Sequence, residues 1–225
     1  HAPRKGLHDA STLPGIAPVY RHPGDSEGHI MSDFYGVYAH CRDSAWRCLI
    51  DFDVCELPVK VVAIARRAGI RVVKDSDVGE LRRDEYGASI KCADSWTIVY
   101  DDSLPAEESR FVIAHELGHI FLGHDCKYSG DATIIDERKL RSETQADMFA
   151  ERLLAPAFAL HELEITDADG IRGLCKLPPG AAKRRARRME LLEERGAFYA
   201  SPLEKRLYSR FYPWLIEFGE GKWVR

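Results

Sequence analysis

The chain has 225 residues, of which 45% are hydrophobic and 30% charged, and its formal net charge at pH 7 is -4. This balance is typical of a globular protein and excludes a largely disordered chain or one that binds nucleic acid through an overall positive charge. No run approaches the roughly 18 apolar residues that a membrane-spanning helix requires, so we expect no membrane association. The six cysteines form no Cys-x-x-Cys pair, which favours reduced thiols in a cytoplasmic protein.

Residues 1–30 are rich in Gly, Pro and His and show no periodicity, as expected of a loop or tail. Met31 is a candidate natural start, so we interpret residues 1–31 as a flexible extension or as residues added before it. From Ser32 apolar residues recur at helical spacing as far as Leu49, which predicts a helix.

The next segment contains a second predicted helix and three short strands. The helix opens at Pro58 and ends at Gly69. Runs of β-branched and aromatic residues then predict strands at 70–73, 89–91 and 96–100. We therefore expect a small, mainly antiparallel three-stranded sheet.

A long helix is predicted after the sheet. Pro105 suits its first turn, Glu107 and Glu108 suit its positive end, and Gly123 is a plausible stop. A looser segment follows, and a second strong helix should start at Glu143.

That second helix should run to Leu154, where Pro156 closes it, and three or four further helices should follow. The predicted fold class is thus α+β, with the small sheet packed on the long helix. We divide the chain into a core at 32–157 and a C-terminal helical region at 158–225.

The sequence His115-Glu116-Leu117-Gly118-His119 is the central motif. Histidines four residues apart lie on one face of a helix and can bind one metal ion, while the intervening glutamate can accept a proton from water. The alternative is a structural pair of core histidines with an ion-paired glutamate. The surrounding apolar helix favours a metal site, because burying these groups without a shared ion would be costly.

A catalytic zinc ion needs a third protein ligand and one open position. The metzincin pattern would require Gly and His where Leu122 and Asp125 stand, so it fails. Glu143 is the better candidate, and Asp147, one turn later, can accept the outer N–H of a ligand histidine. Weaker candidates for the third ligand are His124, Glu137 and Asp147 itself.

Three blocks of sequence together resemble the ImmA/IrrE family of metallopeptidases: PVKVVAIARRAGI, RFVIAHELGHIFLGH and ETQADMFAERLLAP. The chain is similar to members from phages and integrative elements of Gram-positive bacteria. The resemblance implies a cytoplasmic zinc endopeptidase that cleaves a helix-turn-helix repressor and so derepresses mobile-element, phage or stress genes. It implies that His115, His119 and Glu143 hold the metal, that Glu116 is the general base, and that Asp147 supports a ligand.

Several features of the predicted enzyme stay open at this point. Zinc is the expected metal, with manganese as an alternative. A tyrosine or histidine should stabilise the oxyanion, and the candidates are Tyr86, Tyr100, Tyr128 and His124. The strand at 96–100 is a candidate edge for an extended peptide substrate.

A run of basic residues follows the Pro178-Pro179-Gly180 turn, and its members are Lys183, Arg184, Arg185, Arg187 and Arg188. A helix-turn-helix-like unit contacting DNA or an acidic partner is one interpretation, and an exposed helix face paired with nearby glutamates is the favoured one. Two alternatives to the protease remain. One is a non-cleaving antirepressor that binds the repressor through the same groove, and the other is a DNA-binding regulator that uses the basic helix and contains structural zinc.

Overall fold

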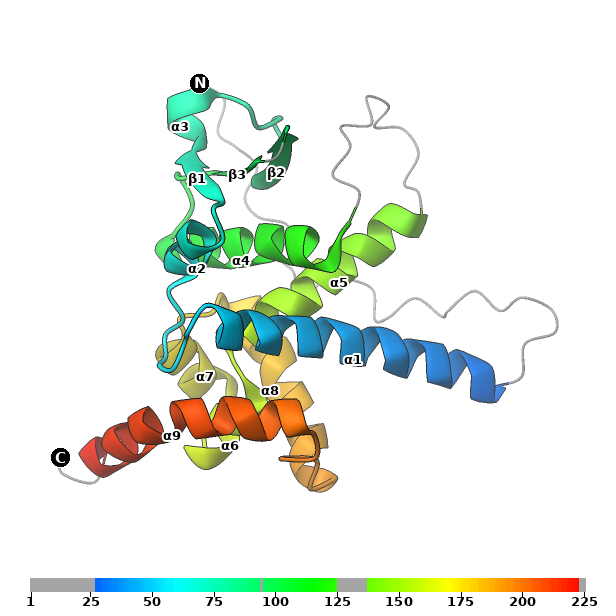
Figure 1. Cartoon of the computed structure of the whole chain (residues 1–225), viewed down its shortest axis with the longest axis vertical. Helices are drawn as coiled ribbons and strands as arrows, with labels where there is room; N and C mark the ends of the chain where they lie inside the picture. The colour runs from blue at the N-terminus through cyan, green and yellow to red at the C-terminus, as the bar shows by residue number, and fades with distance from the viewer. Residues whose placement is uncertain (1–26, 94, 125–136, 223–225) are drawn as a thin grey trace.

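A computed structural model of the chain describes residues 27–93, 95–124 and 137–222 (Figure 1). The helices and strands of these residues are α1 (Glu27–Asp51), α2 (Val61–Arg67), β1 (Arg71–Lys74), α3 (Asp75–Val78), β2 (Gly87–Cys92), β3 (Ser95–Tyr100), α4 (Ala106–Leu122), α5 (Glu137–Leu154), α6 (Ala157–Glu162), α7 (Ala168–Cys175), α8 (Pro179–Glu194) and α9 (Pro202–Lys222). The α+β class and the helical C-terminal region are confirmed. None of the helices within these ranges is long and apolar enough to cross a membrane.

The sheet is mixed, with the strand order β1-β3-β2. β2 and β3 form the expected antiparallel hairpin, in which Gly87 pairs with Tyr100, whereas β1 runs parallel to β3. β3 is therefore the central strand, and the prediction that residues 96–100 form an edge is wrong. Short apolar runs carry little information about strand order, because each of them suits an edge or a centre equally well.

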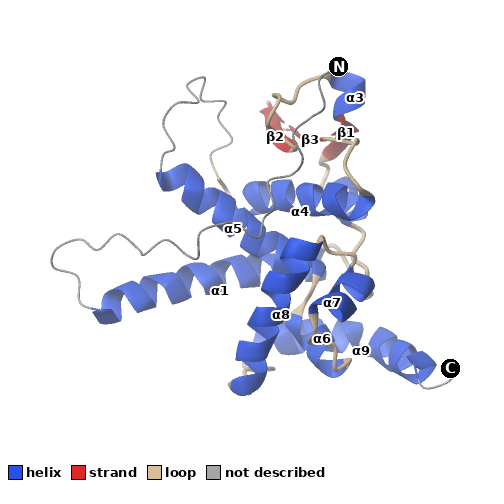
Figure 2. Ribbon diagram, turned by 180° about the vertical axis from the view of Figure 1, so that it is seen from behind, coloured by secondary structure: helices blue, strands red, loops and turns tan. Residues whose placement is uncertain are grey.

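The sheet lies on one side of α4, and α5 and α1 lie on the other side of that helix (Figure 1). α6 to α9 pack below, and α8 stands against the end of α5 (Figure 2). One core joins these layers, and among its fully buried members are Leu49, Leu117, Phe149, Phe158 and Phe211. The helix that carries the motif is thus held from both sides.

The bounds of α4 follow the predicted signals. Pro105 is its N-cap, and Glu107 and Glu108 lie in its first turn. Gly123 ends the helix in a left-handed conformation at φ 70°. This turn brings the backbone N–H of His124 to the carbonyl of His119, at 3.0 Å.

The N-terminal helix starts earlier than the sequence pattern indicates, because α1 already begins at Glu27. Cys41 and Cys48 are both buried in it, as expected for one face of a packed helix, while Cys55 is exposed beyond it. The five cysteines within the described ranges are free thiols. Residues 1–26 lie outside the described residues.

Candidate metal centre

Two imidazoles from α4 approach each other as the four-residue spacing predicts. The Nε2 atoms of His115 and His119 are 3.0 Å apart, and both rings are largely buried. Each ring turns its Nε2 atom to the same point and its Nδ1 atom away from it, because the Nδ1 atoms contact other side chains. This is the arrangement of two ligands aimed at one ion.

Glu143 on α5 completes the group. Its carboxylate oxygens lie 3.2 Å from His115 Nε2 and 3.6 Å from His119 Nε2. The two helices come this close because Gly118 faces α5: a Cβ atom there would lie 3.1 Å from the Cα and carbonyl oxygen of Ala146. The glycine inside the motif therefore sets the distance between the histidine pair and the carboxylate.

These three side chains fit a tetrahedral metal site. Ligand atoms about 2.0–2.1 Å from one zinc ion in tetrahedral geometry stand about 3.3 Å from each other. Here the two Nε2 atoms are 3.0 Å apart, Glu143 Oε2 lies 3.2 Å from His115 Nε2, and Glu143 Oε1 lies 3.6 Å from His119 Nε2. They form a group of ligand atoms within 4.8 Å of one another. The side chain of Glu143 is 46% exposed, so solvent reaches the group on the side of this carboxylate.

The charges of the cluster favour a cation. Burial opposes a charge on Glu143, but hydrogen bonds and charge from His115 and His119 outweigh it and hold the pKa of the carboxyl far below its ordinary value. Burial likewise opposes a charged His115, but its bonds to Asp147 and Glu143 raise its pKa to about 10. A charged imidazole carries a proton on both ring nitrogens, so a metal that binds His115 through Nε2 must displace one of the two protons.

Asp147 lies where the sequence analysis expects it. Its Oδ1 atom accepts a hydrogen bond from His115 Nδ1 at 2.8 Å. Such a bond fixes the proton on the outer nitrogen and leaves Nε2 free for a metal. Arg184 of α8 stands behind this carboxylate at 3.8 Å and donates to Glu151 at 2.6 Å.

Glu116 faces the sheet instead of the ligand carboxylate. It is only 7% exposed, and its carboxylate accepts a hydrogen bond from Ser89 on β2. Gly87 lies directly above it, because a Cβ atom at Gly87 would be 3.0 Å from Glu116 Oε1 and 2.5 Å from Val112 Cγ1. Burial raises the pKa of Glu116, which brings the carboxyl nearer to the range in which a general base works.

The four oxyanion candidates have different surroundings. His124 lies on the outer side of His119, where its ring nitrogens contact His119 Nδ1 and Gln145. Tyr100 pairs with Gly87 and so lies at the end of the sheet that covers Glu116. Tyr86 immediately precedes β2 and is exposed, and Tyr128 lies outside the described residues. Tyr86 and Tyr100 thus remain the candidates at this end of the sheet.

The basic run of α8 turns largely inward. Arg185 is 1% exposed and donates to the carbonyl of Ala155 at 2.8 Å. The Arg188 guanidinium lies over the ring of Tyr38, 4.2 Å from its centroid. With Arg184 engaged by α5, only Lys183 and Arg187 of the five predicted contact residues are exposed.

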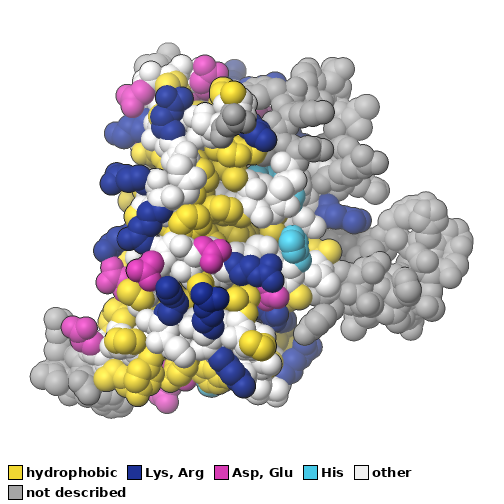
Figure 3. Space-filling view, viewed as in Figure 1, with side chains coloured by type: hydrophobic (Ala, Val, Ile, Leu, Met, Phe, Trp, Pro, Cys, Tyr) yellow, Lys and Arg dark blue, Asp and Glu magenta, His cyan; other side chains and the backbone are white. Residues whose placement is uncertain are grey.

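These inward arginines are structural, and neither sequence interpretation of the run anticipated them. On the face of the molecule in Figure 3, basic side chains are interspersed with acidic ones.

A known family model matches the part of the chain that contains the site. The family model of the IrrE N-terminal-like domain, a peptidase M78 domain, matches residues 65–186. The chain belongs to the ImmA/IrrE family of metallopeptidases. The matched range includes the histidine pair, Glu116, Glu143 and Asp147, and it ends inside α8. No match was found among curated proteins.

Three contributors to the site escaped the sequence analysis. Ser89 and Gly87 could not be connected with Glu116, because the position of β2 above α4 is a tertiary feature. Gln145 could not be connected with the site either, because residues two apart on a helix do not share a face with each other. Its contact with His124 depends on the position of the end of α4 beside α5.

Proposed function

We propose that the chain is a zinc-dependent endopeptidase that cleaves a helix-turn-helix transcriptional repressor and thereby derepresses mobile-element, phage or stress genes. The observation that carries the proposal is the combination of three convergent ligands with the buried Glu116 beside them. Membership of a peptidase family supports the reaction class. The repressor as substrate rests on the family resemblance of the sequence.

Different residues of the chain would bind the metal, transfer the proton and orient the general base during hydrolysis. His115, His119 and Glu143 would hold the metal, which when bound lowers the pKa of water and polarises a carbonyl group. Glu116 accepts the proton of the attacking water and passes it to the nitrogen of the departing amine. Ser89 orients the carboxylate of Glu116 for both transfers.

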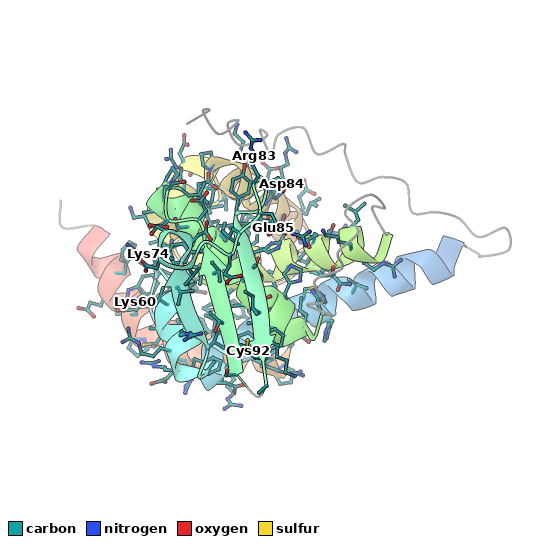
Figure 4. All side chains as sticks on the ribbon, turned by 90° about the horizontal axis from the view of Figure 1, so that it is seen from above. Lys60, Lys74, Arg83, Asp84, Glu85 and Cys92 are labelled. Atoms are coloured by element: carbon teal, nitrogen blue, oxygen red, sulfur yellow. The ribbon has the colours of Figure 1, made fainter. Side chains whose placement is uncertain are left out.

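Among the described residues β2 pairs with a strand on one side only, so an extended substrate could pair with its other edge. β2 is one of the two outer strands of the sheet, and Cys92 marks its far end (Figure 4). A Cβ atom at Gly87, its first residue, would lie 3.0 Å from Glu116 Oε1. A peptide that pairs with this edge would pass its backbone across the site while its side chains point alternately to either face. Arg83, Asp84 and Glu85 stand just before that end of the strand (Figure 4). Their charges would select residues of the substrate close to the cleaved bond.

Cleavage of a defined repressor tests the proposal. The chain is co-expressed with a candidate helix-turn-helix repressor, and fragments of the repressor are identified by mass spectrometry. We expect fragments with the wild-type chain and none with Glu116→Gln, which should still bind metal. Glu108→Gln makes the same change about two helical turns earlier on α4 and should cleave normally.

The amount of enzyme needed separates a protease from a non-cleaving antirepressor. A protease at one hundredth of the repressor concentration should convert all of it, whereas an antirepressor acts only in stoichiometric amounts and leaves the repressor whole. Intact repressor together with relief of DNA binding at equal concentrations would refute the enzymatic proposal. Loss of cleavage in both glutamine variants would show that Glu116 has no special role.

A further inference from the structure

A third histidine, His124, extends the candidate metal centre outward. It follows the left-handed Gly123 at the end of α4, and this turn places its ring edge-on to the ring of His119, with 5.0 Å between the centroids. Its Nδ1 atom lies 3.0 Å from His119 Nδ1, and its Nε2 atom lies 2.9 Å from Gln145 Oε1. His119, His124 and Gln145 thus form a continuous chain of hydrogen bonds that leads away from the site.

The direction of this chain follows from the protons available. A neutral imidazole has one N–H and one lone pair, so a histidine that binds a metal through Nε2 carries its proton on Nδ1. His119 must then donate to His124 Nδ1, and His124 must carry its own proton on Nε2. That N–H needs an acceptor, and the oxygen of Gln145 is the atom that faces it.

The opposite direction is incompatible with the metal site. If Gln145 donated an amide N–H to His124, His124 would donate to His119 Nδ1. The proton of His119 would then sit on Nε2, which points at His115 and Glu143. The orientation of the Gln145 amide therefore decides whether His119 can act as a ligand.

We propose that Gln145 and His124 are positioning residues that fix the proton of His119 on Nδ1, which leaves Nε2 free to bind the metal. Gln145 then does for His119, through His124, what Asp147 does directly for His115. Both acceptors come from α5, on either side of the Ala146 that packs on Gly118. α5 thus supplies one metal ligand, Glu143, and fixes the tautomers of the other two, His115 and His119.

The inference rests on the proposed metal site, and metal affinity tests it without any cleavage assay. Zinc dissociation constants are measured by competition with a chromogenic chelator. Because outer partners of metal ligands typically contribute about 10–100-fold in affinity, we expect Gln145→Leu and His124→Phe each to weaken binding about tenfold or more. Thr144→Val is the matched control, since Thr144 is exposed and its hydroxyl donates to the Leu140 carbonyl of its own helix.

Gln145→Glu distinguishes positioning from mere packing. A carboxylate can only accept a hydrogen bond, so it keeps the required direction and should retain at least wild-type affinity. If Gln145→Glu lost as much affinity as Gln145→Leu, Gln145 would be a donor and the inference would be wrong. Affinities within twofold of wild type for both Gln145→Leu and His124→Phe would also overturn it.

Proton NMR of the cobalt-substituted protein gives a direct signature. The Nδ1–H protons of metal-bound imidazoles are shifted far from the other signals and vanish in D₂O. We expect two such signals in the wild type, and in Gln145→Leu and His124→Phe we expect the one from His119 to be lost through faster exchange with water. Two unchanged signals in both variants would show that His124 and Gln145 do not fix the proton of His119. If the variants lost metal affinity as expected but the wild-type chain cleaved no repressor, the roles of Gln145 and His124 would stand and the proposed protease function would be refuted.

Discussion

Replacing Gly118 by alanine should weaken metal binding even though alanine suits a helix better than glycine. The added Cβ atom would stand 3.1 Å from the Cα and carbonyl oxygen of Ala146 and 3.2 Å from Phe149 Cδ1. Two of these neighbours are backbone atoms, so α5 itself must shift by a few tenths of an ångström. Glu143 and Asp147 would move with it, away from the imidazoles that stay on α4.

The size of the effect can be estimated from two opposing terms. Overpacking a close contact costs about 1–3 kcal/mol, and glycine to alanine in a helix gains about 1 kcal/mol. Gly118→Ala should therefore lower the free energy of unfolding by about 0–2 kcal/mol. Metal sites require positions within about 0.5 Å, so we expect a loss of metal affinity of about tenfold.

Urea unfolding of the metal-free protein and chelator competition measure the two quantities separately. Gly173→Ala is the control, because Gly173 lies in α7 and a Cβ atom there meets nothing within 4 Å. It should stabilise the protein by about 1 kcal/mol and leave metal affinity unchanged. If Gly118→Ala behaved like Gly173→Ala in both assays, close approach of α4 and α5 at Gly118 would not be what builds the site.

Three other predictions concern Glu116, α8 and pH. The Cβ atom added by Gly87→Ala would collide with Val112 and displace Glu116, so we expect kcat to fall at least tenfold. Elemental analysis should still find one metal ion per chain. An unchanged kcat would refute the role of Gly87 in placing Glu116. Arg184→Met leaves Glu151 buried without its partner, so it should lower the free energy of unfolding, measured with urea, by about 2 kcal/mol. The loss is smaller than for a fully buried pair because Arg184 is 32% exposed. The control Lys183→Met, at an exposed residue, should change the free energy of unfolding by no more than about 0.5 kcal/mol. The pKa of His115 in the metal-free protein is raised from 6.5 to about 10, so its contribution to stability is complete below pH 6.5 and lost as pH rises through about 10. Zinc must displace this proton, and calorimetry at pH 7 in buffers of different ionisation enthalpy should show about one proton released; no release would contradict the raised pKa.

The parts of the site that the sequence analysis predicted depend on local rules. The helix from Pro105 to Gly123 follows from its end signals, and the convergence of His115 and His119 follows from a spacing of one helical turn. Glu143 and Asp147 share a helix and a face, so finding one made the other a natural partner.

The parts that could not be predicted depend on tertiary packing. Nothing in the residues at 96–100 shows that this strand has neighbours on both sides, because its side chains suit a central and an edge position equally. The arginines of α8 look like an exposed face, since charged residues are usually at the surface. Arg185 is buried because the carbonyl of Ala155 and the core around it give the guanidinium a specific place.

The contact between Arg184 and the acidic face of α5 matters to anyone who shortens this protein. A fragment that stops after Pro156 would still contain all three residues of the candidate metal site. It would nevertheless lack Arg184, which pairs with Asp147 and Glu151. It would also expose Leu153 and Leu154, which are fully buried at the end of α5. The smallest piece able to capture zinc with native strength should therefore extend through α8.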